Sequence, residues 1–195
     1  MVRIANISGN RKFNAAIIVA LLVAGSSIAH ADTNSAQAIV RHRATPVVTY
    51  TASLQGGYLV VEAEHAPDWH TYAMDNVQRA RDKTGKEKPD CELPTRFDVE
   101  GPIELTGAWR QSHPADLSDP SIHWYTWGFE DRAVFAAPAT VTGEGPITIT
   151  INAQACNASS CSMVQDVKLT LDTSQRGENE IDYDALVQLQ AESQD

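Results

Sequence analysis

The chain has 195 residues, of which 43% are hydrophobic, and its 25 acidic residues outnumber 15 basic ones. Three basic residues and no acidic ones lie in the first 31 positions, so the remaining chain has twelve basic and 25 acidic residues, a net charge of −13. A chain of this length can form one domain with its own core. Its negative charge repels phosphate backbones, which excludes nucleic acid as an expected partner.

Residues 1–31 have the pattern of a secretory signal peptide. Basic residues precede an apolar run at 15–24, which is too short to span a hydrocarbon core of ~30 Å as a helix. Residues 29–31, Ala-His-Ala, then supply the small-x-small site that signal peptidase accepts. We therefore predict cleavage before Asp32 and an exported, periplasmic protein; the alternative is an uncleaved membrane anchor.

Composition divides the rest of the chain into three parts. Residues 32–45 are polar without a clear period, which predicts a flexible lead-in. Residues 46–172 contain strand-like segments separated by turn residues, but the charged stretch 75–90, with Gly85 inside it, predicts a loop. Residues 173–195 predict an acidic tail, which either frays or forms a short amphipathic turn.

The central part predicts an all-β fold. Gln55-Gly56-Gly57 separates two β-branched and aromatic segments, which is typical of a hairpin. The segments expected to be strands are 47–51, 58–63, 69–74, 95–99, 103–109, 122–129, 133–141, 147–151 and 167–171. The last two alternate in strict period two. Short strands joined by turns, without a long helical period, predict an immunoglobulin-like antiparallel β-sandwich.

Three cysteines, Cys91, Cys156 and Cys161, follow the predicted signal peptide. Thiols pair in an oxidising compartment, and an odd number leaves one thiol over. Cys156 and Cys161 flank a four-residue connection between the two most regular segments, so each lies near a strand end beside the other. We predict a disulfide between them, with Cα atoms ~4.4–6.8 Å apart. The role of Cys91 stays open.

This disulfide is either structural or redox-active. The chain-entropy model assigns about 2 kcal/mol to closing so small a ring, against about 4.7 kcal/mol for a hundred-residue loop. A bond at a hairpin end therefore adds little stability, yet a partner reaches it easily and it can open without unfolding the sheets. Small residues between the cysteines favour accessible sulfurs, but no basic residue within five positions favours a thiolate.

The histidines give no metal signal. No two of them have a metal-ligand spacing such as H-x3-H, so we expect neither a metal site nor a bound cofactor. His70 has two interpretations. Its imidazole, close to a thiol, could take or give the exchange proton, or it could simply fill the edge of the sandwich.

Four short sequence motifs, called landmarks below, occur in a characteristic order along the chain. They are Trp69-His70-Thr71-Tyr72, then Trp109, then Trp127-Gly128-Phe129-Glu130 ahead of a strand, then Cys156-x4-Cys161 ahead of a final strand. In this order and spacing, residues 46–171 resemble the N-terminal periplasmic domain of the thiol:disulfide interchange protein DsbD. The chain departs from that pattern at Ser162-Met163-Val164, where the family has a proline, and in its extra Cys91.

The resemblance implies an immunoglobulin-like sandwich and a role for the cysteine pair. In that family the pair accepts electrons from a membrane-embedded thiol reductant and passes them to periplasmic thiol proteins of thioredoxin fold. By resemblance, Cys161 forms the mixed disulfides and Cys156 resolves them. His70 and Tyr72 form the aromatic-polar cluster beside the pair.

The sequence leaves two functions open. The first is a monomeric thiol–disulfide relay without a cofactor, a component of a protein-disulfide reductase system. In that case the resemblance also places a cap loop over the disulfide, between Trp109 and Trp124. The second is an immunoglobulin-like binding or scaffold module, in which the hairpin disulfide is only structural.

Overall fold

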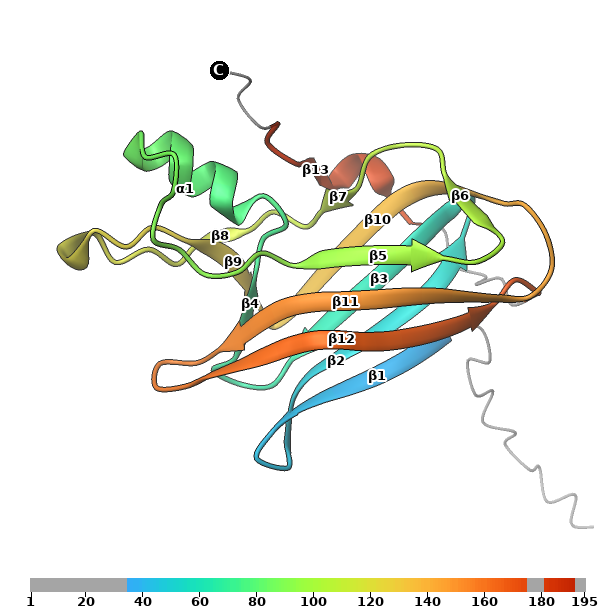
Figure 1. Ribbon diagram of the computed structural model, residues 1–195, viewed down its shortest axis with the longest axis horizontal. Helices are drawn as coiled ribbons and strands as arrows, with labels where there is room; N and C mark the ends of the chain where they lie inside the picture. Colours follow the sequence, from blue (N-terminus) through green and yellow to red (C-terminus); the bar gives the residue numbers. More distant parts are fainter. Residues whose placement is uncertain (1–34, 175–180, 192–195) are drawn as a thin grey trace, which may run out of the picture. The chain divides into compact units, whose positions relative to one another are not determined.

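The computed structural model describes residues 35–174 and 181–191. The predicted signal peptide, residues 1–31, lies outside these ranges. The described chain forms two antiparallel β-sheets that share one hydrophobic core (Figure 1). None of the helices in the described ranges has the length and hydropathy needed to cross a membrane.

One sheet has seven strands, in the order β1-β2-β3-β10-β7-β13, with β6 paired to β10. Its strands are β1 (Ser35–His42), β2 (Thr45–Gln55), β3 (Tyr58–His65), β6 (Ile103–Leu105), β7 (Arg110–Gln111), β10 (Arg132–Val141) and β13 (Val187–Gln188).

The other sheet has six strands, in the order β12-β11-β4-β9-β8, with β5 paired to β11. Its strands are β4 (His70–Tyr72), β5 (Arg96–Glu100), β8 (Ala115–Asp116), β9 (Trp127–Glu130), β11 (Pro146–Cys156) and β12 (Cys161–Asp172). On the side away from β12, the first part of β11 pairs with β5, and the end of β11 pairs with β4. The end of β11 is therefore a junction of three elements.

Alternation along the long strands builds the core. In β11 the side chains of Ile147, Ile149 and Ile151 are fully buried, and those of Tyr50 and Phe135 from the first sheet join the same cluster. A segment in which buried and outward residues alternate with period two forms a strand with one face in the core. The predicted all-β antiparallel sandwich is confirmed.

A β-bulge in β12 sets the register of the last hairpin. The pairing of the first part of β11, continued without the bulge, would place Ser162 opposite Cys156. The extra residue Asp166, with φ of 52°, lets Cys161 take that place, and its N–H donates to Asn152 Oδ1 over 3.0 Å. Since a shift of one residue turns side chains to the other face, the bulge also keeps Cys161 on the outer face.

The predicted flexible lead-in, residues 32–45, is wrong for most of its length. Residues Ser35–His42 form β1, which pairs with β2. Its inward side chains are Ala36, Ala38 and Val40, which pack on the core. Two alanines in three inward positions give little hydrophobic contrast, so the period of this strand is weak in the sequence.

The predicted loop at residues 75–90 contains a helix, α1 (Asn76–Thr84), so this prediction is also wrong. Gly85 ends the helix in the left-handed conformation, with φ of 67°, and donates its N–H to the Arg81 carbonyl. The side chains that the helix buries are those of Asn76, Gln78 and Ala80. A helix that buries polar side chains lacks the apolar period by which helices are recognised.

The predicted acidic tail, residues 173–195, is ordered where it is described after residue 180. A short 3-10 helix, η2 (Tyr183–Ala185), precedes β13, which pairs with β7. The Arg110 guanidinium lies 4.3 Å from the centre of the Tyr183 ring and bonds Asp184 over 2.9 Å. This part of the tail packs on the first sheet rather than fraying.

Candidate functional site

The predicted disulfide is present and joins Cys156, the last residue of β11, to Cys161, the first of β12. The two are direct register partners, and their Cα atoms lie 4.0 Å apart, slightly closer than predicted. A tight turn follows, in which Asn157 N–H donates to the Ser160 carbonyl over 2.9 Å and Asn157 Oδ1 accepts from Ser160 N–H over 2.8 Å. The local sequence thus closes the hairpin and aligns the sulfurs.

The two cysteines differ sharply in exposure. Cys156 is only 2% exposed, whereas Cys161 belongs to the exposed residues. An attacking thiolate must approach one sulfur in line with the bond while the other sulfur leaves. The arrangement therefore leaves Cys161 open to an approaching thiolate and keeps Cys156 covered.

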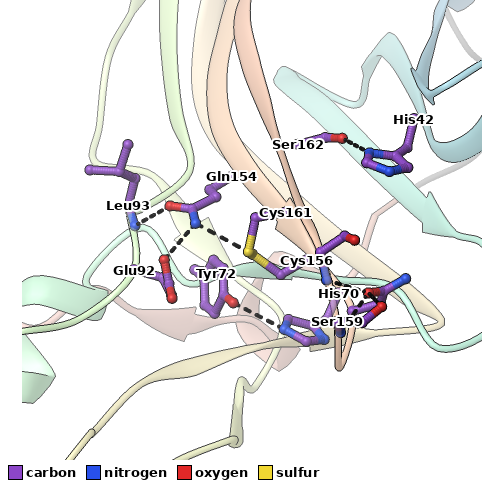
Figure 2. Close-up of a disulfide and its surroundings, with 12 residues drawn as sticks. His42, His70, Tyr72, Glu92, Leu93, Gln154, Cys156, Ser159, Cys161 and Ser162 are labelled. Atoms are coloured by element: carbon purple, nitrogen blue, oxygen red, sulfur yellow. Dashed lines mark hydrogen bonds between the residues drawn. A yellow bond between two sulfur atoms is a disulfide. The ribbon is translucent and has the colours of Figure 1, made fainter.

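His70 lies directly beside the disulfide. In the register of β4 with β11 it is the partner of Cys156, and on its other side it is the partner of Glu130 in β9. Its Nε2 is 3.0 Å from the Tyr72 hydroxyl, and the two rings meet edge-on (Figure 2). The structure thus brings both residues that the resemblance had selected next to the cysteine pair.

Burial determines the charge of this pair of rings. It lowers the pKa of His70, although Glu130 and Glu92 act in the opposite direction. It also raises the pKa of the Tyr72 hydroxyl, and Glu92 raises it further. Near neutral pH, His70 is therefore a neutral imidazole beside a neutral phenol.

The close approach of β4 to β9 depends on Gly128. A Cβ atom at this position would collide with the Thr71 carbonyl oxygen of β4. Glycine lets the two backbones approach because it has no side chain. The Trp127-Gly128 landmark therefore fixes β4, and with it His70, against the sheet.

Two functional candidates were missed by the sequence reasoning, Glu92 and Gln154. A Glu92 carboxylate oxygen and the sulfurs of Cys156 and Cys161 all lie within 4.8 Å of one another. Gln154 Nε2 donates to Glu92 over 2.5 Å and to Cys156 Sγ over 3.4 Å. Figure 2 shows the Gln154 amide between the carboxylate and the sulfur pair.

A hydrogen-bond network centred on Asn76 holds the Glu92 segment in place. Asn76, at the start of α1, donates its side-chain N–H groups to the Glu92 carbonyl and to Thr126 Oγ1, each over 2.9 Å. Its Oδ1 accepts from Trp127 N–H over 2.7 Å. Leu93 N–H donates to Gln154 Oε1 over 3.2 Å. Glu92 lies 64 positions before Cys156 in the chain, so no local sequence motif could predict that the two residues meet. Gln154 could have been found, because it lies two positions before Cys156 and therefore on the same outer face of β11.

A groove lies along the residues of β12 that follow Cys161. Leu93 and Met163 are 49% and 57% exposed, respectively. They line a groove of about 290 Å³ together with the apolar Pro94, Ala153 and Val164 and the polar Arg96, Asn152 and Gln165. Large apolar side chains at an exposed edge are typical of surfaces that contact another molecule.

Two further sequence candidates are the expected cap loop and Cys91. Between Trp109 and Trp124, where the resemblance expects a cap loop, the structure has β7, β8 and the 3-10 helix η1 (Pro120–Ile122), with Ile122 68% exposed. Cys91 carries no disulfide and is half-buried. Burial raises the pKa of its thiol, and the charges of Glu92 and Asp90 raise it further.

Comparison with solved structures finds proteins of similar fold. The fold is similar to that of the N-terminal periplasmic domain of ScsB from Proteus mirabilis. The TM-score is 0.56 at 12% sequence identity, over 78% of this chain and 57% of that one, so this chain spans little more than half the length of the ScsB structure. At this identity the likeness concerns the fold.

A second similar structure is the N-terminal domain of DsbD from Neisseria meningitidis in its reduced form. Here the TM-score is 0.43 at 15% identity, over 66% of this chain and 85% of that one. No family model and no curated protein sequence matches this chain. The fold shared with the periplasmic domain of ScsB agrees with the fold that the resemblance predicted, and the predicted cysteine pair is present.

Proposed function

We propose that this chain is a thiol–disulfide exchange relay of the periplasm, with Cys161 as the attacked and attacking sulfur and Cys156 as the resolving one. The observation that carries the proposal is the asymmetry of the disulfide, an exposed Cys161 bonded to a buried Cys156 at a hairpin end. Such a bond can open while the sheets of the sandwich stay paired.

Reduction of the relay takes two steps. A thiolate of the electron donor attacks Cys161 Sγ, the bond to Cys156 breaks, and the Cys156 sulfur leaves with the electron pair and takes a proton. A second donor thiol then attacks the mixed disulfide. This step releases Cys161 as a thiolate, and the donor becomes the disulfide.

Oxidation reverses these roles. The Cys161 thiolate attacks a disulfide of the acceptor protein and forms a mixed disulfide, from which one acceptor thiol leaves. Cys156 then loses its proton and attacks Cys161, which restores the intramolecular bond and releases the second acceptor thiol. Two electrons and two protons pass from donor to acceptor in each cycle.

The surrounding side chains act on the buried sulfur. Gln154 Nε2 donates to Cys156 Sγ, and this bond steadies the sulfur as negative charge develops on it. The Glu92 carboxylate disfavours a lasting second negative charge nearby. His70, neutral and directly opposite Cys156, is placed to pass a proton to or from that sulfur.

We further propose that the partners are thioredoxin-fold proteins and a membrane thiol reductant, and that the relay acts as a monomer without a cofactor. The four-landmark resemblance to DsbD and the predicted signal peptide support these partners and the periplasmic location. The fold likeness to a periplasmic domain of ScsB is consistent with both.

Trapping of mixed disulfides tests the assignment of the two sulfurs. Cys156→Ser and Cys161→Ser are each made with Cys91→Ser, so that the third thiol forms no adducts. Each is incubated with a thioredoxin-fold protein that lacks its resolving cysteine. Cys156→Ser should accumulate the covalent adduct and Cys161→Ser much less. Equal trapping, or trapping by Cys161→Ser alone, would contradict the proposed roles.

The groove beside Leu93 and Met163 favours a second candidate, a binding module with a structural disulfide. The reduction potential separates the two functions. Titration of the Cys156–Cys161 bond in glutathione or dithiothreitol buffers should give a value above about −300 mV for a relay. A value well below it would mark a resistant structural bond and favour the binding module.

A further inference from the structure

The reduced cysteine pair has a third potential ligand beside it. A Glu92 carboxylate oxygen lies within 4.8 Å of both sulfurs, and these three groups come from three parts of the chain, the end of β11, the start of β12 and the segment before β5. Two thiolates and a carboxylate are ligands that Zn²⁺ accepts. We propose that the reduced form binds one Zn²⁺ through Cys156, Cys161 and Glu92.

The geometry of the hairpin suits such a site. In a tetrahedral zinc site with Zn–S distances of about 2.3 Å, two sulfurs stand about 3.8 Å apart. The Cα atoms of Cys156 and Cys161 are 4.0 Å apart on the same outer face. Rotation about the Cα–Cβ bonds therefore separates the sulfurs enough once their bond is reduced. Three protein ligands leave the fourth position to water.

A neighbouring amide already orients two of the three ligands. Gln154 Nε2 donates to a Glu92 carboxylate oxygen and also contacts Cys156 Sγ. Hydrogen bonds of this kind hold metal ligands in position and strengthen binding. The Glu92 backbone is held independently, by Asn76. The carboxylate is thus fixed beside the sulfurs before any ion arrives.

The chemistry of the site depends on the redox state. A phosphine or dithiol reductant supplies two electrons, and the disulfide takes up two protons to become two thiols. Zn²⁺ then displaces these two protons, and both sulfurs bind as thiolates. The metal-bound thiolates are withheld from a partner disulfide, so Zn²⁺ keeps the pair reduced and out of exchange. The inference requires only that the disulfide can be reduced, whether or not the chain is a relay.

Zinc titration of the reduced protein tests the site. Cys91→Ser protein is reduced with a phosphine, freed of reductant under argon and titrated with Zn²⁺ against a chromophoric chelator. One equivalent should bind with release of two protons, and Co²⁺ in its place should give a thiolate-to-cobalt charge-transfer band. The oxidised protein should bind at least 100-fold more weakly, because its sulfurs are not thiolates.

Matched variants assign the ligands. Glu92→Gln should weaken zinc binding at least tenfold, whereas Glu130→Gln, which removes the same charge on the far side of His70, should change it little. Circular dichroism checks each fold, and Glu92→Ala replaces Glu92→Gln if that variant is misfolded. Equal zinc affinity of Glu92→Gln and the parent protein, or equal binding by oxidised and reduced protein, overturns the proposal. Failure of thiol exchange alone would leave it intact.

Discussion

The two halves of the β11–β12 hairpin differ in what holds them. Before the bulge at Asp166, Ile147 and Ile149 face the core and are fully buried, while outward side chains such as Thr148 and Lys168 meet solvent. Beyond the bulge the inward residues are smaller, and the outward Cys156 is covered by groups from β4 and from the segment around Glu92.

This difference separates stability from chemistry within one pair of strands. Apolar burial stabilises the first half. Truncating one of its buried side chains lowers the free energy of unfolding in proportion to the apolar area lost and the cavity volume left behind. The second half gains little from its small side chains. Its geometry depends on register, on β4 and on the hydrogen bonds of Gln154.

Asp166→Val should have the largest effect on the second half. The bulge needs a φ of 52° at this position, which a β-branched residue rarely adopts. Pairing without the bulge continues the register of the first half and brings Ser162 opposite Cys156, and Cys161 then turns to the other face. We expect fewer molecules to form the Cys156–Cys161 disulfide than in the parent protein. Alkylation of free thiols followed by mass spectrometry measures this.

Asp166→Gly is the matched control for that substitution. Glycine adopts the left-handed conformation of this position, with φ of 52°, without strain. The backbone N–H that bonds Asn152 is kept. This variant should retain the disulfide and change the free energy of unfolding by less than about 1 kcal/mol. If Asp166→Val forms the bond as readily as Asp166→Gly, the bulge does not set the register.

Ile149→Ala should affect the first half alone. The side chain is fully buried in the core, so its truncation should lower the free energy of unfolding by about 2–5 kcal/mol. Because Ile149 is distant in register from the cysteines, the reduction potential of the disulfide should not change. Urea unfolding and a redox titration measure the two quantities on the same sample, and a shifted potential would mean that the halves are coupled.

The sequence predicted well what depends on local order. The disulfide follows from two regular strands joined by a short turn, and the sandwich follows from alternation. The positions of His70 and Tyr72 beside the pair came from the resemblance, since β4 reaches β11 only through the tertiary fold.

The missed features have physical causes. Glu92 and Gln154 meet across 62 positions of sequence, and no local pattern specifies that contact. Helix α1 buries Asn76 and Gln78, so it lacks an apolar period. In β1 two of the inward residues are alanines, so the alternation of apolar and polar residues is weak in the sequence. Polar burial and small side chains are the two cases in which hydrophobic periodicity carries little information.

His65 should make the anchoring of β4 sensitive to acid. Its Nε2 is 2.8 Å from Thr71 Oγ1 of β4, and burial lowers its pKa to about 4, although the Asp131 carbonyl acts in the opposite direction. Between pH 6.5 and 4 the unfolded chain binds a proton that the folded chain does not. Stability is therefore lost as pH falls through this window.

After discounting for partial exposure of the ring, we expect His65 to account for a loss of about 2 kcal/mol between pH 7 and pH 4. His65→Gln keeps a hydrogen-bonding group for Thr71 but removes the titration, so its unfolding free energy should fall less over this window. His123→Gln, at an exposed position, is the control. If His65→Gln shows the same pH dependence as the parent chain, His65 is not the group responsible.

Loss of the disulfide itself should have a small effect on stability. Cys156→Ser and Cys161→Ser, each with Cys91→Ser, remove a ring closed by a sequence separation of five. The entropy of so small a ring amounts to no more than about 2 kcal/mol, so both variants should fold at ambient temperature, as unfolding in urea will show, and both should lose thiol exchange. Ile149→Ala should show the reverse pattern, with a lower stability and intact exchange. If either serine variant fails to fold, the bond stabilises the hairpin more than its ring size accounts for. The second half of the hairpin would then be a structural element, and the relay would lose its main physical support.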